Sequence, residues 1–475
     1  MTRKNVAASP GIAAHRLRRF ALLFLTLFLF GQTVPHAAAQ DGSQPVFGVV
    51  EAGAHPAAAE QLGADWERLT FHWNKFQPGG PDDFNPEAIS NAALESARAA
   101  GRQVVGLIKD TPAWASASGS PAAVPAGLDL PHDDPANHFA SFVRRLVTHY
   151  STQGIHHWII WNEPDIRPGE GSVEFEGEVE DYFRLLKSGY LAARAADPNA
   201  HIQMAGLTWW YDSERGREPY LLRLLRVISA DPDARRHNWY FDGISLHIYF
   251  TTSTVWSLTG AYRHILSQFG LQSKAIWLTE YNASPRRDPA AAIGAPFSLS
   301  LEQQADFIVQ ASALALAAGV DRMAVYKLYD DNFVPGQTEP WGLVRADGSL
   351  RPAFHAYQQV MAIFAGARNV RRYSNNTATL ITGGTRLVLW NDTFEAGEFM
   401  IAVSGTPEVQ VADAYGSQWT VEVANGTAIL DAPPAERVDV DWVVVAGPVR
   451  LVTIPGNLRS VAFRSASGVT AHLYP

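Results

Sequence analysis

The chain of 475 residues contains no cysteine. That absence excludes disulfide bonds, thiolate nucleophiles, iron–sulfur clusters and cysteine-ligated zinc together. Lys and Arg (38) are fewer than Asp and Glu (47), so the formal charge is −9 and no basic excess is available to neutralise the phosphates of a nucleic acid. The sequence also has no G-x-x-x-x-G-K-[ST] phosphate loop and no H-E-x-x-H zinc motif. We therefore expect no nucleic-acid partner and no metal or other cofactor.

A membrane-spanning apolar run is lacking as well. The apolar run Phe20–Phe30 has eleven residues, too few to cross roughly 30 Å of hydrocarbon. It follows five basic residues and precedes the small residues Ala37–Ala39, an order typical of a secretory signal peptide. We predict a signal peptide over residues 1–39 with cleavage before Gln40. Its removal takes five basic and no acidic residues, which changes the formal charge from −9 to −14. The sequence thus predicts a secreted or cell-envelope protein without stable membrane insertion.

From Val46 to Ala365, short strand-like runs alternate with helical segments. Strand–helix alternation predicts a parallel sheet, and eight units predict a closed (β/α)8 TIM barrel over residues 40–366. A doubly wound open sheet is the alternative, but its G-x-G-x-x-G signature is missing after the first run. Helices are expected from Pro86 to Gly101, over Pro135–Thr152 and over Glu302–Ala318. The eight strand-like runs are Phe47–Glu51, Glu67–Trp73, Gln103–Ile108, His157–Trp161, Ile202–Leu207, Gly243–Tyr249, Ala275–Thr279 and Met323–Tyr329.

The last part of the chain has a different pattern. Residues 367–475 show no helical period, and Gly, Asn, Asp and Pro separate their strand-like runs. This pattern predicts an all-β, sandwich-like C-terminal domain. We expect it to pack against the barrel, with carbohydrate binding as the alternative role. The runs are Thr385–Trp390, Phe399–Ser404, Trp442–Val445 and Val461–Arg464.

Two glutamates stand where apolar runs end. Glu163 follows the fourth run, and Glu280 follows the seventh. Barrel enzymes build their sites at the carboxyl ends of the strands, and strands four and seven lie across that opening from each other. Glycosidic cleavage requires two facing carboxyl groups, of which one protonates the leaving oxygen and the other attacks or activates water. The sequence therefore predicts a glycosidase site formed by these two side chains.

Strand alternation predicts which neighbours share this site. One face of the sixth run is aliphatic, which places His247 and Tyr249 of the other face inside the barrel. Asn162 and Glu163 are adjacent and would point opposite ways in an ideal strand. For both to serve one site, the fourth strand must bulge or end there, and Pro164 favours an end.

The residues Trp161–Pro164 resemble the strand-four signature of the clan A glycoside hydrolases, and Thr279–Asn282 resembles their strand-seven nucleophile motif. The resemblance covers residues 46–365 and is strongest to family 39, with family 5 as the nearest alternative. It implies that Glu163 is the general acid and then the base, and that Glu280 is the nucleophile of a retaining double displacement. It also implies that Asn162 hydrogen-bonds the 2-hydroxyl of the sugar.

The same resemblance extends to the surrounding residues. Arg68 is similar to the clan's strand-two arginine, and His247 and Tyr249 are similar to its strand-six pair, whose tyrosine touches the nucleophile. Trp114 and Trp341 match positions of aromatic subsite residues. Other tryptophans at strand ends are candidate subsite walls: Trp73, Trp209, Trp210 and Trp256. We expect the acidic stretch 170–181, on the loop after the fourth run, to be a solvated loop, with a cover over the cleft as the alternative.

The resemblance implies a secreted retaining hydrolase that cleaves O-glycosidic bonds of a poly- or oligosaccharide. A transglycosylase would use the same two carboxylates and differ only in its acceptor. An inactive carbohydrate-binding barrel and an inverting hydrolase are further alternatives.

Overall fold

The computed structural model describes residues 46–291, 299–331, 334, 337–367, 369–373, 378–383, 386–438 and 444–474. The predicted signal peptide and the cleavage site before Gln40 lie outside these residues. No helix within the described ranges is long and apolar enough to span a bilayer.

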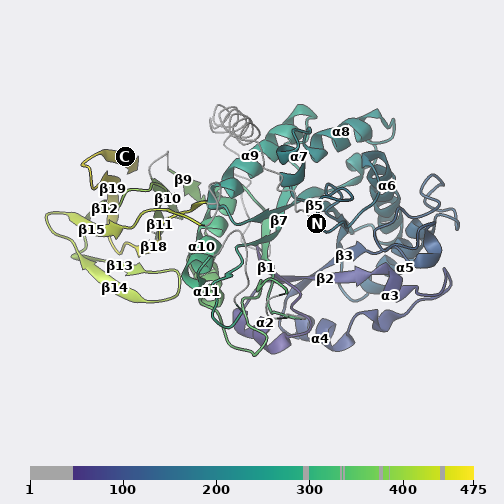
Figure 1. The fold of residues 1–475 in the computed structure, drawn as a ribbon, viewed down its shortest axis with the longest axis horizontal. Helices are drawn as coiled ribbons and strands as arrows, with labels where there is room; N and C mark the ends of the chain where they lie inside the picture. The colour runs from purple at the N-terminus through teal and green to yellow at the C-terminus, as the bar shows by residue number, and fades with distance from the viewer. Residues whose placement is uncertain are drawn as a thin grey trace, which may run out of the picture.

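The predicted barrel is confirmed. Strands β1 to β8 are parallel and close in sequence order (Figure 1). The eighth strand is shorter than expected and ends at Val325, because the chain turns towards the Trp341 segment, where Lys327 N–H donates to Trp341 O (3.3 Å). The strands are β1 (Phe47–Val50), β2 (Trp66–His72), β3 (Gln103–Lys109), β4 (His157–Asn162), β5 (His201–Leu207), β6 (Gly243–Tyr249), β7 (Ala275–Asn282) and β8 (Arg322–Val325).

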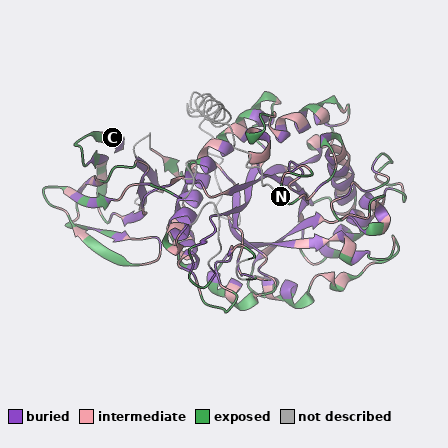
Figure 2. Ribbon diagram, viewed as in Figure 1, coloured by how far each residue is buried: buried purple, intermediate pink, exposed green. Residues whose placement is uncertain are grey.

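The two faces of the barrel strands form separate cores. Trp66, Leu107, Ile159 and Trp277 belong to one buried cluster inside the barrel, whereas the alternate residues pack outward against the helices. A side chain at Gly48 would lie 2.2 Å from the Trp66 ring, so glycine there makes room for the indole. Figure 2 shows the strands buried along most of their length.

Helix starts follow the capping residues. The single helix expected after Pro86 is divided in two, because Asn85 caps η1 and Ser90 caps α4 in succession. Asn137 likewise caps α5 and delays its start to His138. The helices are α2 (Pro56–Leu62), α3 (Trp73–Phe76), η1 (Pro86–Ala88), α4 (Asn91–Ala99), η2 (Ala113–Ala115), α5 (His138–Ser151), α6 (Val179–Ala196), α7 (Trp210–Glu214), α8 (Tyr220–Ala230), η3 (Asn238–Tyr240), α9 (Thr252–Gln268), α10 (Leu301–Ala317) and α11 (Pro352–Phe364).

The C-terminal residues form antiparallel sheets, as predicted. Two of these sheets have the orders β14-β13-β18-β11-β10-β9 and β15-β12-β19-β20, and they share a core that includes Phe399, Ile401 and Phe463. This domain lies beside α10 and α11 (Figure 1), where Val449 N–H donates to Asp306 (2.9 Å). The strands are β9 (Arg371–Arg372), β10 (Ala378–Thr382), β11 (Arg386–Asn391), β12 (Gly397–Ser404), β13 (Glu408–Ala412), β14 (Gln418–Glu422), β15 (Thr427–Ala432), β16 (Glu436–Arg437), β17 (Val444–Val445), β18 (Arg450–Thr453), β19 (Asn457–Ser465) and β20 (Thr470–Tyr474).

Candidate active site

Strand β4 ends at Asn162, and the backbone departs from strand geometry on both sides of it. Trp161 and Glu163 have positive φ angles of 72° and 39°. The N–H of Glu163 then donates to Gly206 O of β5 (3.1 Å). The strict alternation of side chains is thus broken where the sequence required it, and the strand ends directly before Glu163.

In strand β7 the alternation of side chains is likewise broken, here by a bulge. Leu278 pairs with Leu246 of β6, but the next pair joins Glu280 to His247, so Thr279 is an extra residue on β7. A bulge of one residue reverses the faces that follow it. Glu280 therefore shares the inward face with Trp277, although the two residues are three positions apart.

These two strand ends bring the predicted acids together. His247 Nδ1 lies 2.6 Å from Glu163 Oε1 and 3.5 Å from Glu280 Oε2. One ligand atom from each of these three residues lies within 4.8 Å of the others. The side chain of Glu163 is 17% exposed and that of Glu280 only 8%. The pair therefore consists of a more accessible and a more enclosed carboxyl group.

Glu280 is held in its ionised form by its neighbours. Arg68 Nη2 donates to Oε1 (2.5 Å), and the Tyr249 hydroxyl donates to Oε2. Burial alone raises the pKa of Glu280, but His247, Arg68 and the Tyr249 hydrogen bond outweigh it and hold that pKa below its usual value. Burial and the charge of Glu280 raise the pKa of Tyr249, which therefore remains a hydrogen-bond donor.

Asn162 and Asp165 complete the end of β4. Asn162 is buried, and its Oδ1 has no hydrogen-bond partner in the described part of the chain. Asp165 Oδ2 accepts hydrogen bonds from Thr208 N (2.8 Å) and Trp209 N (3.2 Å), which ties the turn after β4 to the end of β5. Burial and the nearby charge of Glu163 raise the pKa of Asp165 to about 6. The Oδ1 atom of Asn162 can thus accept a hydrogen bond from a bound hydroxyl group.

Trp341 lies at the edge of this cluster. Its ring centroid is 4.9 Å from that of Tyr249, and it also contacts Phe250 and Tyr326. Asn282, at the end of β7, donates from Nδ2 to Trp341 O (2.7 Å) and fixes this segment. The structure therefore brings Trp341 beside the predicted site residues.

Trp114 occupies a different environment. Its indole donates to Gln77 O (2.7 Å) and its ring contacts Trp73 and His138. A substrate contact of Trp114 stays a prediction. Trp73 is fully buried in the core, so it offers no ring surface to a ligand.

The prediction that residues 170–181 form a solvated acidic loop is wrong in part, because residues 179–181 begin α6 and Asp181 pairs with Arg184. Glu170 is paired with Arg215 and Arg217, and Glu174 is paired with Lys109. Hydrogen bonding to Arg217 is the main reason that the pKa of Glu170 is lowered to about 2. The loop after β4 is thus attached to its surroundings by ion pairs.

Gly206 is a site residue that the sequence interpretation missed. A side chain there would lie 2.0 Å from His247 Nε2, so the imidazole occupies the space that glycine leaves. His247 Nε2 then lies 3.1 Å from Thr279 Oγ1. The one signal for this role in the sequence is the position of Gly206, which is the last residue but one of β5.

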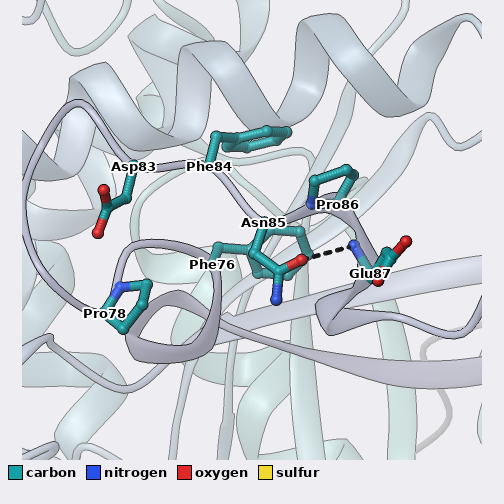
Figure 3. A pocket seen from close by; sticks show the side chains of 7 residues that line it. All are labelled: Phe76, Pro78, Asp83, Phe84, Asn85, Pro86 and Glu87. Atoms are coloured by element: carbon teal, nitrogen blue, oxygen red, sulfur yellow. Dashed lines mark hydrogen bonds between the residues drawn. The ribbon is translucent and has the colours of Figure 1, made fainter.

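A separate, shallow hollow of about 450 Å³ lies between α3 and η1 (Figure 3). Phe84 and the exposed Asp83 and Glu87 are among its lining residues. Asn85, which also lines it, accepts a hydrogen bond from Glu87 N as the cap of η1. Its acidic groups face solvent without the cationic and hydroxyl partners that Glu280 has. The paired glutamates are therefore the stronger candidate site.

Glu163, His247 and Glu280 also have the ligand types of a divalent metal ion. The guanidinium of Arg68, however, already lies against Glu280 and supplies the positive charge that an ion would bring. The arrangement is better suited to metal-free acid and base chemistry.

No protein-family model and no curated protein matches the sequence. Solved structures do match it. A family 39 glycoside hydrolase from Bacteroides cellulosilyticus WH2 matches with a TM-score of 0.64 and 15% identity over 87% of this chain and 82% of that one.

Two further structures match at similar identity. A GH39 β-xylosidase from Caulobacter crescentus has a TM-score of 0.55 and 13% identity, covering 89% of this chain and 98% of its own. A GH30 endoxylanase from Clostridium papyrosolvens C71 has a TM-score of 0.52 and 14% identity, covering 86% and 97%. The fold of the chain is therefore that of these glycoside hydrolases, and the expected likeness to family 39 is confirmed at the level of the fold.

Proposed function

We propose that the protein is a secreted, retaining glycoside hydrolase that acts on a poly- or oligosaccharide. The observation that supports this most strongly is the approach of Glu163 and Glu280, whose ligand oxygens lie within 4.8 Å of each other. Retaining enzymes separate their carboxyl groups by about 5–5.5 Å, whereas inverting enzymes need about 6.5–9.5 Å to admit a water molecule. The short separation favours double displacement.

In this mechanism Glu280 attacks the anomeric carbon while Glu163 donates a proton to the leaving oxygen. The covalent glycosyl–enzyme is then hydrolysed by water, from which Glu163 removes a proton. Arg68 and Tyr249 keep Glu280 ionised and oriented, as the lowered pKa of Glu280 indicates. The free Oδ1 of Asn162 accepts a hydrogen bond from the sugar 2-hydroxyl.

The substrate class follows from the same neighbourhood and from the fold. The half-buried Trp341 ring beside Tyr249 offers an apolar surface for the C–H face of a sugar. Structures that match the chain include the β-xylosidase and the endoxylanase named above and a glucosidase from Croceicoccus marinus, which makes xylosides and glucosides the first substrates to test. Export is supported by the basic, apolar and small-residue segments of the N-terminus.

The test is hydrolysis of a panel of 4-nitrophenyl glycosides in both anomeric configurations, with the first-formed product anomer identified by NMR. We expect turnover with retention, and a loss of about 10³-fold or more in kcat/KM for Glu280→Gln. Glu398→Gln makes the same chemical change on strand β12 and should leave turnover intact.

Each alternative gives a distinct result in this assay. Sugar binding without turnover would indicate an inactive binding barrel, and product inversion would contradict double displacement. Transfer products that dominate at high acceptor concentration would identify a transglycosylase.

A further inference from the structure

The segment that follows β5 brings Tyr211 of α7 to the end of the barrel that holds Glu163. Glu163 N–H is bonded to Gly206 O, and Tyr211 follows Gly206 by five residues. The Tyr211 side chain is half-buried, and within the described ranges its hydroxyl has no hydrogen-bond partner. Burial and then the charge of Glu163 raise the pKa of Tyr211, so its hydroxyl remains a hydrogen-bond donor.

Partly buried ion pairs hold this segment against the loop that follows β4. Glu170 of that loop accepts hydrogen bonds from Arg217 Nη1 (2.5 Å) and Nη2 (2.9 Å). Arg217 also donates from Nε to Asp212 (2.7 Å) and from Nη2 to the carbonyl of Tyr211 (3.1 Å). The side chain of Glu170 is 12% exposed and that of Asp212 only 3%, so solvent screens these pairs poorly. The backbone of Tyr211 is therefore fixed relative to the loop that carries Glu163.

The ring of Tyr211 is fixed as well. A Cβ atom at Gly171 would lie 2.4 Å from the Tyr211 hydroxyl oxygen, so the end of the ring rests on the bare backbone of the β4 loop. The guanidinium of Arg215 lies over the ring, 5.6 Å from its centroid. A rigid, half-exposed aromatic ring with a free hydroxyl is a typical sugar-binding surface, since it combines C–H stacking with one hydrogen bond.

We propose that Tyr211 binds the sugar on the leaving-group side of the scissile bond. This rests on the proposed function, because the acid that protonates the leaving oxygen must lie on the side of the leaving group. The segment that carries Tyr211 is hydrogen-bonded to Glu163 N–H and to Asp165, directly after β4. The natural substrate is then one whose leaving group is itself a sugar rather than a small alcohol. Tyr211 is a specificity-determining residue, and the ion pairs of Glu170 and Arg217 position it.

The test compares two substrates with the same glycone, for example xylobiose and β-xylosyl fluoride if the aryl-glycoside panel identifies xylose. The fluoride substrate has no sugar on the leaving-group side. The ratio of kcat/KM for the disaccharide to kcat/KM for the fluoride therefore measures the contribution of the leaving-group sugar alone. We expect Tyr211→Ala to lower this ratio about tenfold or more, and Tyr211→Phe, which keeps the ring, to lower it less. The ratio does not depend on the fraction of folded enzyme.

A second variant keeps Tyr211 and moves it. Gly171→Ala adds a methyl group where the hydroxyl lies, and we expect it to lower the same ratio by a smaller factor. Phe394→Ala, which truncates an exposed ring in the β domain, is the matched control and should leave the ratio at the wild-type value. An unchanged ratio in Tyr211→Ala overturns the inference. Failure of the wild-type protein to cleave either substrate overturns the proposed function instead.

Discussion

The barrel encloses ionisable side chains at both of its ends, and the two groups have different neighbours. At the carboxyl ends of the strands, Arg68 and His247 meet carboxylates, and Glu163 keeps some exposure. At the amino ends, Arg322 and His201 instead lie on the ring of Trp277, the guanidinium carbon of Arg322 at 4.5 Å from its centroid.

The chemistry of the two ends differs accordingly. Arg322 donates to Gln103 and lies 3.4 Å from His157 Nε2. Burial lowers the pKa of Arg322 to about 10, although the charges of Asp321 and Asp65 oppose this effect. Burial lowers the pKa of His157 to about 2 and that of His201 to about 4, which leaves both imidazoles uncharged near neutrality. One end therefore maintains charges that face a partly open site, and the other packs its polar groups into the interior. Burial of an ionisable group alone does not identify a functional site; its partners and its access do.

Removal of the cation from the carboxyl end should have the largest effect. Arg68→Leu leaves Glu280 buried without its guanidinium, so the pKa of Glu280 rises and less of it is ionised at low pH. We expect kcat/KM to fall about 10²-fold or more and its acidic limb to move to higher pH, measured as a pH–rate profile. Arg322→Leu makes the same replacement at the other end, and a matching shift of its acidic limb would contradict the contrast between the two ends.

The amino end should instead control how stability depends on pH. His157 binds a proton in the unfolded chain below its ordinary pKa of 6.5, but in the folded protein only near pH 2. Because the unfolded state then binds more protons, the free energy of unfolding should fall as the pH falls below 6.5, by up to about 1.4 kcal/mol per pH unit for this one group. Urea unfolding of wild type and His157→Gln between pH 7 and pH 5 measures this slope. The slope should be smaller in the variant, and equal slopes would show that His157 does not contribute.

The smallest effect is expected at a surface ion pair outside the barrel. Glu398 and Arg464 pair across β12 and β19 with about half of each side chain exposed. Glu398→Gln should change the free energy of unfolding by no more than about 0.5 kcal/mol, since solvent screens such pairs. The same urea titration checks this value, and a loss several times larger would mean that the pair is coupled to the sheet.

Much of the fold could be predicted because it follows from local patterns. Strand–helix alternation and the positions of Glu163 and Glu280 are visible along the chain, and the aliphatic face of β6 assigned His247 to the interior. The interruption at Asn162 was also foreseeable from strand geometry and Pro164.

The rest depends on pairing between segments that are distant in sequence. The bulge at Thr279 is a property of the register between β6 and β7, so alternation along β7 alone gives the wrong face for Glu280. Glu170 and Arg217 are joined only when the segments that follow β4 and β5 meet, and the sequence around Glu170 resembles that of a solvated loop. Tertiary contacts, rather than propensity, decide such positions.

Gly206 has a consequence for the tolerance of the chain to substitution. Since His247 fills the volume above its Cα, every other amino acid at position 206 must displace the imidazole or distort β5. A saturation library at this one codon, selected for activity, should therefore return glycine almost alone, while the neighbouring strand positions accept several apolar replacements. Position 206 would then be among the least variable positions of the barrel, although β5 contributes neither of the paired acids.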